Sequence, residues 1–91
     1  MKSILQDVKM CYFCGTCRNL EEHHIYAGAL RGVSERNGFK VWLCHTCHNE
    51  PPFGVHFCEE RNIMLKRKCQ IEYERGHSRE EFIRLIGKNY R

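Results

Sequence analysis

Two Cys-x-x-Cys pairs constrain the fold of this chain more than any other feature of its sequence. The first pair is Cys11 and Cys14, and the second is Cys44 and Cys47, about thirty residues later. Gly15 follows the first pair, and a glycine there lets the backbone turn so that its amides face the sulfurs. Four thiolates form a closed tetrahedral zinc site, which stabilises a fold and does no catalysis. The spacing therefore predicts one structural zinc that joins two distant segments.

Cys17 leaves the composition of the first pair open. Cys14 and Cys17 have the same spacing and form a second possible pair. We favour Cys11 with Cys14, because the glycine then follows the pair. Cys17 is then a bystander or a replacement ligand.

The cysteine count also bears on the compartment. The chain has 91 residues and seven cysteines, an odd number, and residues 1–8 contain no apolar run long enough for a signal peptide. Cysteine pairs among histidines in a reducing compartment are more often zinc ligands than disulfides. We therefore expect a cytoplasmic protein, and no segment approaches the length of a transmembrane helix.

The pattern of apolar and turn-forming residues predicts a single α+β domain. Two strands are expected at 20–26 and 39–43, joined by a loop with at most one helical turn around 34–36. A helix is expected from about 53 to 73, ended by Gly76. A capping box at Ser78 starts a short helix that ends at Gly87. Residues 1–10 predict only a short strand or helical turn that packs on the core.

Histidines gather in the middle of the chain, whereas basic residues gather at its end. His23 and His24 are adjacent on a predicted strand and therefore point to opposite faces, so one can hold a metal while the other reaches a substrate. His23, His48 and His56 are candidates to share a second metal with open coordination positions. Residues 61–91 carry nine Lys/Arg against four Asp/Glu, while residues 1–60 carry six against seven. This asymmetry suits a polyanion, although a solvated helix face explains it equally well.

These motifs resemble those of the HNH endonucleases, also called His-Me finger or ββα-metal nucleases, and especially the small HNH-type proteins of bacteriophages and prophages. The resemblance covers about residues 11–90. The specific segments are His23-His24-Ile25 and Leu43-Cys44-His45-Thr46-Cys47-His48. Gly54-Val55-His56 also matches, and the tail Gly87-Lys88-Asn89-Tyr90 is only suggestive.

The resemblance implies a zinc-stabilised ββα-metal core, with the knuckle and core at about 11–75 and a helical tail at about 76–91. It implies a metal-dependent endonuclease that hydrolyses DNA in the bacterial host cytoplasm. His23, His48 and His56 would bind a catalytic magnesium, manganese or zinc ion, and His24 would be the general base. The family's middle asparagine, which orients the base or braces the loop, has its candidate in Asn37. Candidate phosphate contacts are Arg31, Arg36, Lys40, Lys66, Arg67 and Lys68.

Two other classes of function remain open at this point. A zinc-stabilised nucleic-acid-binding module would keep the four cysteines and the basic tail without needing the histidines to converge. A protein-interaction factor, for example a phage protein acting on a host protein, would use the basic tail as its contact surface. Because one fold can host all three functions, the geometry of the site has to distinguish them.

Overall fold

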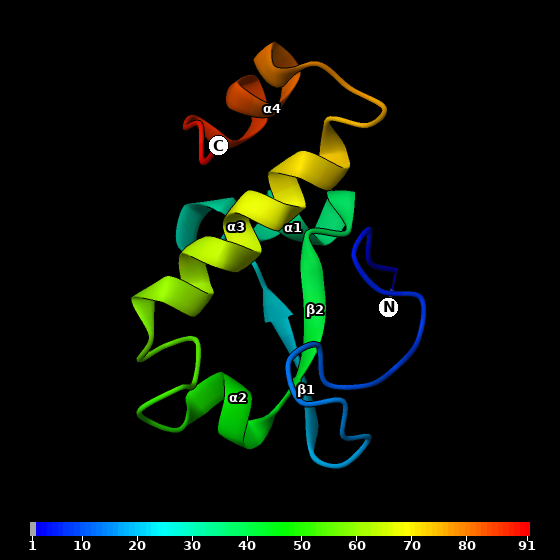
Figure 1. Ribbon diagram of the computed structural model, residues 1–91. Helices are drawn as coiled ribbons and strands as arrows, with labels where there is room; N and C mark the ends of the chain where they lie inside the picture. Colours follow the sequence, from blue (N-terminus) through cyan, green and yellow to red (C-terminus); the bar gives the residue numbers. More distant parts are fainter. Residues whose placement is uncertain (1) are drawn as a thin grey trace.

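The computed structural model describes residues 2–91 and shows a small α+β fold built around one two-stranded antiparallel hairpin (Figure 1). Strand β1 is Leu20–His24 and strand β2 is Lys40–Cys44. A 3-10 turn, η1 (Gly28–Leu30), and helix α1 (Arg31–Asn37) join them. The short helix α2 (His45–Asn49) follows β2 directly, and α3 (Glu59–Tyr73) and α4 (Arg79–Ile86) complete the chain.

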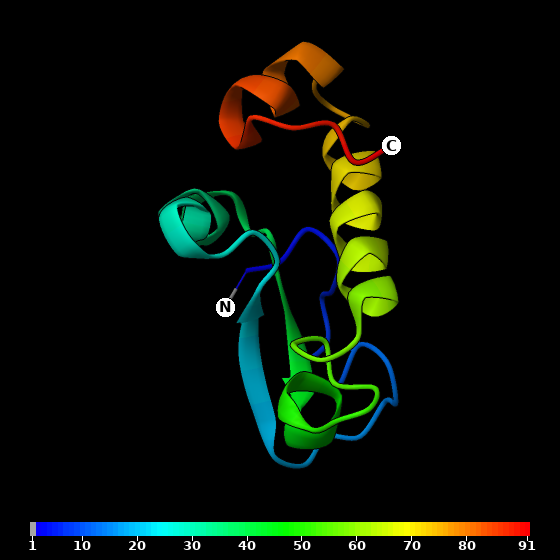
Figure 2. The same cartoon turned by 90° about the vertical axis from the view of Figure 1, so that its left-hand side faces the viewer.

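The pairing of the strands decides which side chains share a face. His23 lies opposite Val41, and His24 lies opposite Lys40. Because side chains alternate along a strand, His23 shares a face with Val41 and Leu43, whereas His24 and Lys40 are on the other face. The first face packs against α3, and α1 lies at the far end of the hairpin, away from α3 (Figure 2).

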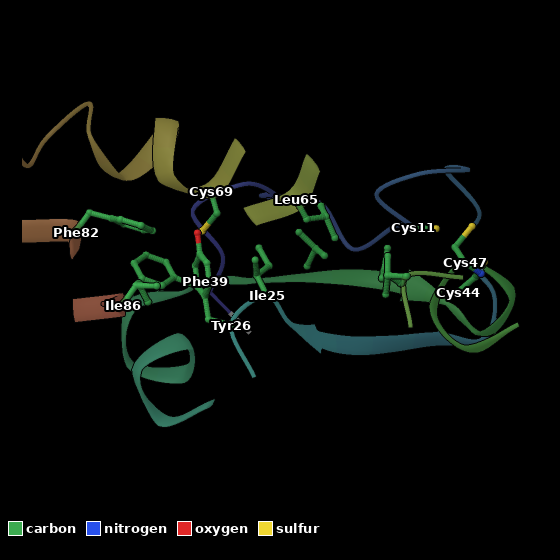
Figure 3. Close-up of a cluster of buried hydrophobic side chains, with 13 residues drawn as sticks. Cys11, Ile25, Tyr26, Phe39, Cys44, Cys47, Leu65, Cys69, Phe82 and Ile86 are labelled. Carbon is green, nitrogen blue, oxygen red and sulfur yellow. Dashed lines mark hydrogen bonds between the residues drawn. The ribbon is translucent and has the colours of Figure 1, made fainter. Parts of the chain in front are cut away.

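The core extends along the inner face of the hairpin, between α3 and α4 and the cysteine knuckles (Figure 3). Phe39 and Phe82 are fully buried at one end, where Tyr26 packs edge-on against both rings. Leu65 and Cys69 of α3 cover the middle. At the other end Cys11, Cys44 and Cys47 are buried. The cysteine site is therefore one wall of the core rather than an appendage.

The segment before the first knuckle covers the outer edge of β2. The amide of Ile4 donates to Gly38, the amide of Tyr12 donates to Trp42, and the side chain of Gln6 accepts from the Trp42 amide. Residues 2–10 thus contribute neither of the short elements that the sequence predicts, although Ile4 and Leu5 do pack on the core. The outer edge of β1 pairs with no strand within residues 2–91.

Two helix predictions are wrong, because contacts with other segments decide the conformation in both places. Residues 31–37 form a two-turn helix instead of a loop, because Gly38 ends it in the left-handed conformation (φ 72°) and the buried Ser34 hydroxyl bonds to Tyr26. Helix α3 begins at Glu59 instead of Phe53, because the backbone from Gly54 to Phe57 turns back toward α2. The capping box of Ser78 and Glu81 and the end of α4 at Gly87 are confirmed. Among residues 2–91, no helix combines the length and apolar character that a membrane crossing requires.

Candidate metal centres

The two cysteine pairs come together in space. The sulfurs of Cys11, Cys14, Cys44 and Cys47 all lie within 4.8 Å of one another, and those of Cys14 and Cys44 are 3.6 Å apart. Sulfurs placed tetrahedrally at ~2.3 Å from a zinc ion are roughly 3.8 Å apart. All seven cysteines are free thiols. The spacing of the four sulfurs thus fits a zinc ion and excludes a disulfide, which needs ~2.05 Å.

Each pair has the backbone geometry of a zinc knuckle. The Cys14 amide points at the Cys11 sulfur and the Cys47 amide at the Cys44 sulfur, both at 3.5 Å. Gly15 supplies the predicted turn with φ 78°. Burial raises the pKa of Cys11, but hydrogen bonds from backbone amides, that of Cys14 foremost, outweigh it and lower the pKa to about 6. Such amides stabilise thiolates, which is what a zinc ligand requires.

The four cysteines can all be deprotonated at once only if a cation offsets the repulsion between their thiolates. Burial, helped by the neighbouring Cys44 and Cys11 sulfurs, raises the pKa of Cys47 to about 12. A divalent ion would remove that penalty and would leave no open coordination position. The predicted four-cysteine cluster is confirmed, and it fits a structural zinc. Cys17 is exposed and lies outside the cluster.

A second cluster gathers three histidines. Ligand nitrogens of His23, His48 and His56 lie within 4.8 Å of one another. The Nε2 atoms of His48 and His56 are 3.0 Å apart, and the His23 ring is 5.0 Å from that of His48 and 5.4 Å from that of His56. The side chains come from β1, α2 and the loop after α2. The structure therefore brings together the three histidines that the sequence indicates.

His23 carries the observation that most favours a metal here. Its side chain is 5% exposed, and its Nε2 atom is the one buried side-chain nitrogen or oxygen in residues 2–91 without a hydrogen-bond partner. A buried polar atom without a partner costs about 1–3 kcal/mol. Burial, with the charges of His48 and His56, lowers the pKa of His23 to about 3. The imidazole is therefore neutral at pH 7, the form that binds metals.

His56 reaches the cluster because residues 50–57 fold back on α2. The amide of Val55 donates to the Cys47 carbonyl and that of His56 to the His48 carbonyl. Gly54 permits this return, since a Cβ atom there would lie 2.6 Å from the Glu50 carbonyl oxygen. A continuous helix from residue 53, as the sequence predicts, would not make this return.

Glu21 orients the second histidine. Its carboxylate accepts from His48 Nδ1 at 2.8 Å and from the Asn49 amide at 2.7 Å, and it also contacts His45 Nδ1 at 2.9 Å. With its proton on Nδ1, His48 presents the lone pair of Nε2 toward His56. A carboxylate behind a ligating histidine is the usual second layer of a metal site.

His24 lies apart from the three histidines, on the opposite face of β1. Its Nε2 atom is 2.9 Å from the carboxylate of Glu35 in α1. The side-chain amide of Asn37 donates to the Val33 carbonyl at 2.8 Å, and no hydrogen bond in residues 2–91 joins it to His24. Asn37 thus braces α1. It makes no hydrogen bond through which it could orient His24, as the resemblance implies it would.

The candidate phosphate contacts before α3 differ in their exposure to solvent. Arg31 and Arg36 are exposed on α1, and Arg31 lines a pocket of about 390 Å³ with His24, Gly32 and Glu35. Lys40 is 4% exposed and its ammonium group faces Glu35 and Glu22, so it is not presented to solvent as a phosphate contact requires.

The basic run of α3 does not form one face. Lys66 is half-buried beneath the Tyr90 ring, the side chain of Arg67 donates to the Tyr90 carbonyl, and Lys68 is exposed. Successive residues of a helix point in different directions, and two of these three cations already contact Tyr90, so only Lys68 is free of a contact in residues 2–91.

Sequence reasoning missed Glu21 and Glu35. Strand alternation could have found Glu21, because it lies two residues before His23 and therefore on the same face. Glu35 falls in a segment expected to be a loop, so no periodicity pointed to it. No family model, curated protein or solved structure matches the chain.

Proposed function

We propose that this protein is a metal-dependent endonuclease of the HNH type, of the kind encoded by bacteriophages, that hydrolyses phosphodiester bonds in DNA. The convergence of His23, His48 and His56 around a buried nitrogen without a partner carries the proposal. A nucleic-acid-binding module would need the four cysteines but gains nothing from an orphaned histidine. A buried nitrogen without a partner destabilises the fold, and a ligand that binds to that nitrogen in the folded state offsets the loss.

In this proposal one phosphate lies along the edge of β1 that pairs with no strand in residues 2–91 and reaches both histidine environments. His23 and His24 point to opposite faces of the strand, and no other strand pairs with its outer edge in residues 2–91. The two rings are close enough for a charge on His24 to lower the pKa of His23. A phosphodiester lying across this edge would contact His24 on one side and the three-histidine site on the other.

In this proposal the side chains divide the work of hydrolysis. His24 accepts the proton of the attacking water as the oxygen bonds to phosphorus, and the bond from phosphorus to the 3′ oxygen breaks. His23, His48 and His56 would hold a divalent ion that stabilises charge on the phosphate oxygens and the leaving oxygen. Arg31, in the same pocket as His24, is placed to contact a phosphate.

Replacing the two adjacent histidines separately tests these roles. His24→Ala should lower plasmid nicking by on the order of 10²–10⁴, the usual contribution of a positioned base, with metal affinity near that of the wild type. His23→Ala removes a ligand, so both metal affinity and nicking should fall, and excess metal should partly restore nicking. The assays are supercoiled-plasmid nicking in magnesium, manganese or zinc and calorimetric metal titration of the zinc-loaded protein.

His77→Ala is the matched control, because His77 is exposed and stacks on Tyr73 far along the chain from both sites. It should nick DNA like the wild type. Equal losses of metal affinity in His23→Ala and His24→Ala would mean that the roles are misassigned. A wild type that binds DNA without cleaving it in any of the three metals would indicate the binding module, and one that does neither would indicate the interaction factor.

A further inference from the structure

Glu35 of α1 is the hydrogen-bond partner of His24. The distance from His24 Nε2 to Glu35 Oε1 is 2.9 Å, whereas the nearest oxygen of Glu22 is 3.8 Å away and too far for a hydrogen bond. His24 is buried while Glu35 is 54% exposed, so the carboxylate closes over the imidazole from the solvent side. The contact joins the end of β1 to the first helix after it.

Lys40 keeps the Glu35 carboxylate ionised. Its buried ammonium group contacts the second oxygen of Glu35 and lies 3.3 Å from Glu22. The hydrogen bond from Lys40, followed by that from His24, lowers the pKa of Glu35 to about 2. An ionised carboxylate only accepts hydrogen bonds, so Nε2 of His24 has to be the donor. In the neutral ring the lone pair is then on Nδ1.

Nδ1 of His24 is the ring nitrogen left for a substrate. It makes no hydrogen bond in residues 2–91, and it is not among their fully buried atoms without a partner, as Nε2 of His23 is. The ring lines the pocket of about 390 Å³ that also contains Arg31. The pocket therefore places His24 and a cation beside the same space, where a water and a phosphate would bind in the proposed function.

We propose that Glu35 is the positioning residue for His24, holding the imidazole in the tautomer that has its proton on Nε2 and its lone pair on Nδ1. The inference rests on the proposed function for its catalytic consequence, but the tautomer is a property of the protein itself. Through this contact Glu35 takes the part in orienting the base that the family resemblance implies for Asn37.

A metal site formed by Glu22, His24 and Glu35 is the competing explanation of the same cluster. Their ligand atoms lie within 4.8 Å of one another. The ammonium group of Lys40, however, already contacts both carboxylates and supplies the positive charge that a metal would bring. The tautomer arrangement therefore accounts for all four side chains without an added ion.

Nitrogen NMR of the His24 ring tests the tautomer directly, in zinc-loaded protein without a second metal at pH 8. The wild type should show a protonated Nε2 and an unprotonated Nδ1. Glu35→Ala should average the two nitrogens toward each other, and Glu35→Gln, whose amide oxygen still accepts a hydrogen bond, should keep most of the wild-type pattern. Glu72→Gln is the control and should change nothing, because within residues 2–91 the Glu72 carboxylate pairs only with exposed Arg75.

Steady-state plasmid nicking then measures the catalytic effect. Glu35→Ala should lower kcat on the order of 10–100-fold, by analogy with the partners that orient metal-bound histidines, with KM and metal affinity unchanged. Glu35→Gln should show a smaller decrease. A wild type that does not nick DNA would refute the proposed function and leave the NMR result standing.

Three results would overturn the inference itself. The first is a wild-type His24 with its proton on Nδ1. The second is an unchanged tautomer and kcat in Glu35→Ala despite a lower Tm, which would make Glu35 merely structural. The third is broadening of His24 signals by substoichiometric manganese before those of His48, which would assign the cluster to a metal.

Discussion

Replacing Glu21 tests whether the three histidines form a built metal site. Its carboxylate holds His48 at 2.8 Å and Asn49 at 2.7 Å, and it also contacts His45. Glu21→Ala removes the acceptor that keeps the proton of His48 on Nδ1, so the ring can rotate or change tautomer and its Nε2 is no longer fixed toward the metal. Partners of this kind contribute 10–100-fold to metal affinity, which corresponds to about 1.4–2.7 kcal/mol.

The affinity should be measured by calorimetric titration of manganese or zinc into protein whose cysteine site is already loaded. Glu21→Gln should weaken binding less than Glu21→Ala, because its amide oxygen can still accept from His48. Glu22→Ala is the matched control, since Glu22 is the next residue on β1 and points to the other face. An unchanged affinity in Glu21→Ala, or an equal decrease in Glu22→Ala, would refute the assignment of Glu21 to this site.

Three further predictions concern stability and DNA binding. Cys44→Ser should abolish stoichiometric zinc binding and lower Tm by more than ~10 °C, since 1 kcal/mol corresponds to ~4–8 °C in a domain of this size. A Cys44→Ser variant that melts like the wild type, or a wild type without tightly bound zinc, would contradict the structural role. Because unfolded His23 takes up a proton near pH 6.5 and folded His23 only near pH 3, the unfolded state binds more protons and stability rises with pH over that window. The test is urea unfolding of zinc-loaded protein without a second metal. From pH 7 to pH 5 the free energy of unfolding of the wild type should fall by about 2 kcal/mol more than that of His23→Asn, and equal decreases in the two proteins would refute the lowered pKa. Alanine at Lys66, Arg67 and Lys68 should reduce the salt dependence of DNA binding by ~0.9 for each phosphate that these side chains neutralise, and an unchanged slope in a salt titration would assign this run to solubility.

The sequence was informative wherever the chemistry is local. A cysteine pair with a following glycine contains its own turn, so Cys11 and Cys14 were predicted as a knuckle from a few residues. The capping box of Ser78 likewise depends only on neighbours three residues apart. Strand alternation alone separated His23 from His24, and the structure places them on opposite faces.

The sequence failed where a distant segment decides the local conformation. Residues 31–37 contain a glycine and polar residues typical of a loop, yet the contact of Ser34 with Tyr26 and the turn at Gly38 make them a helix. Residues 53–57 have no strong barrier to helix formation, but their amides bond back to α2. In both places tertiary hydrogen bonds outweigh intrinsic propensities of less than about 1 kcal/mol per residue.

The sequence by itself therefore determined the residue types of the two clusters, four thiols and a set of histidines, and the strand that carries His23 and His24. Only the tertiary structure decided their partners. It buried the Nε2 atom of His23, placed Glu21 behind His48, and brought Glu35 to His24 and Lys40 to Glu35. These contacts join residues on different elements, up to 27 positions apart for Glu21 and His48, and they depend on which faces pack together. No local pattern encodes that packing, because it results from burying the hairpin against α3 while α1 closes its other end.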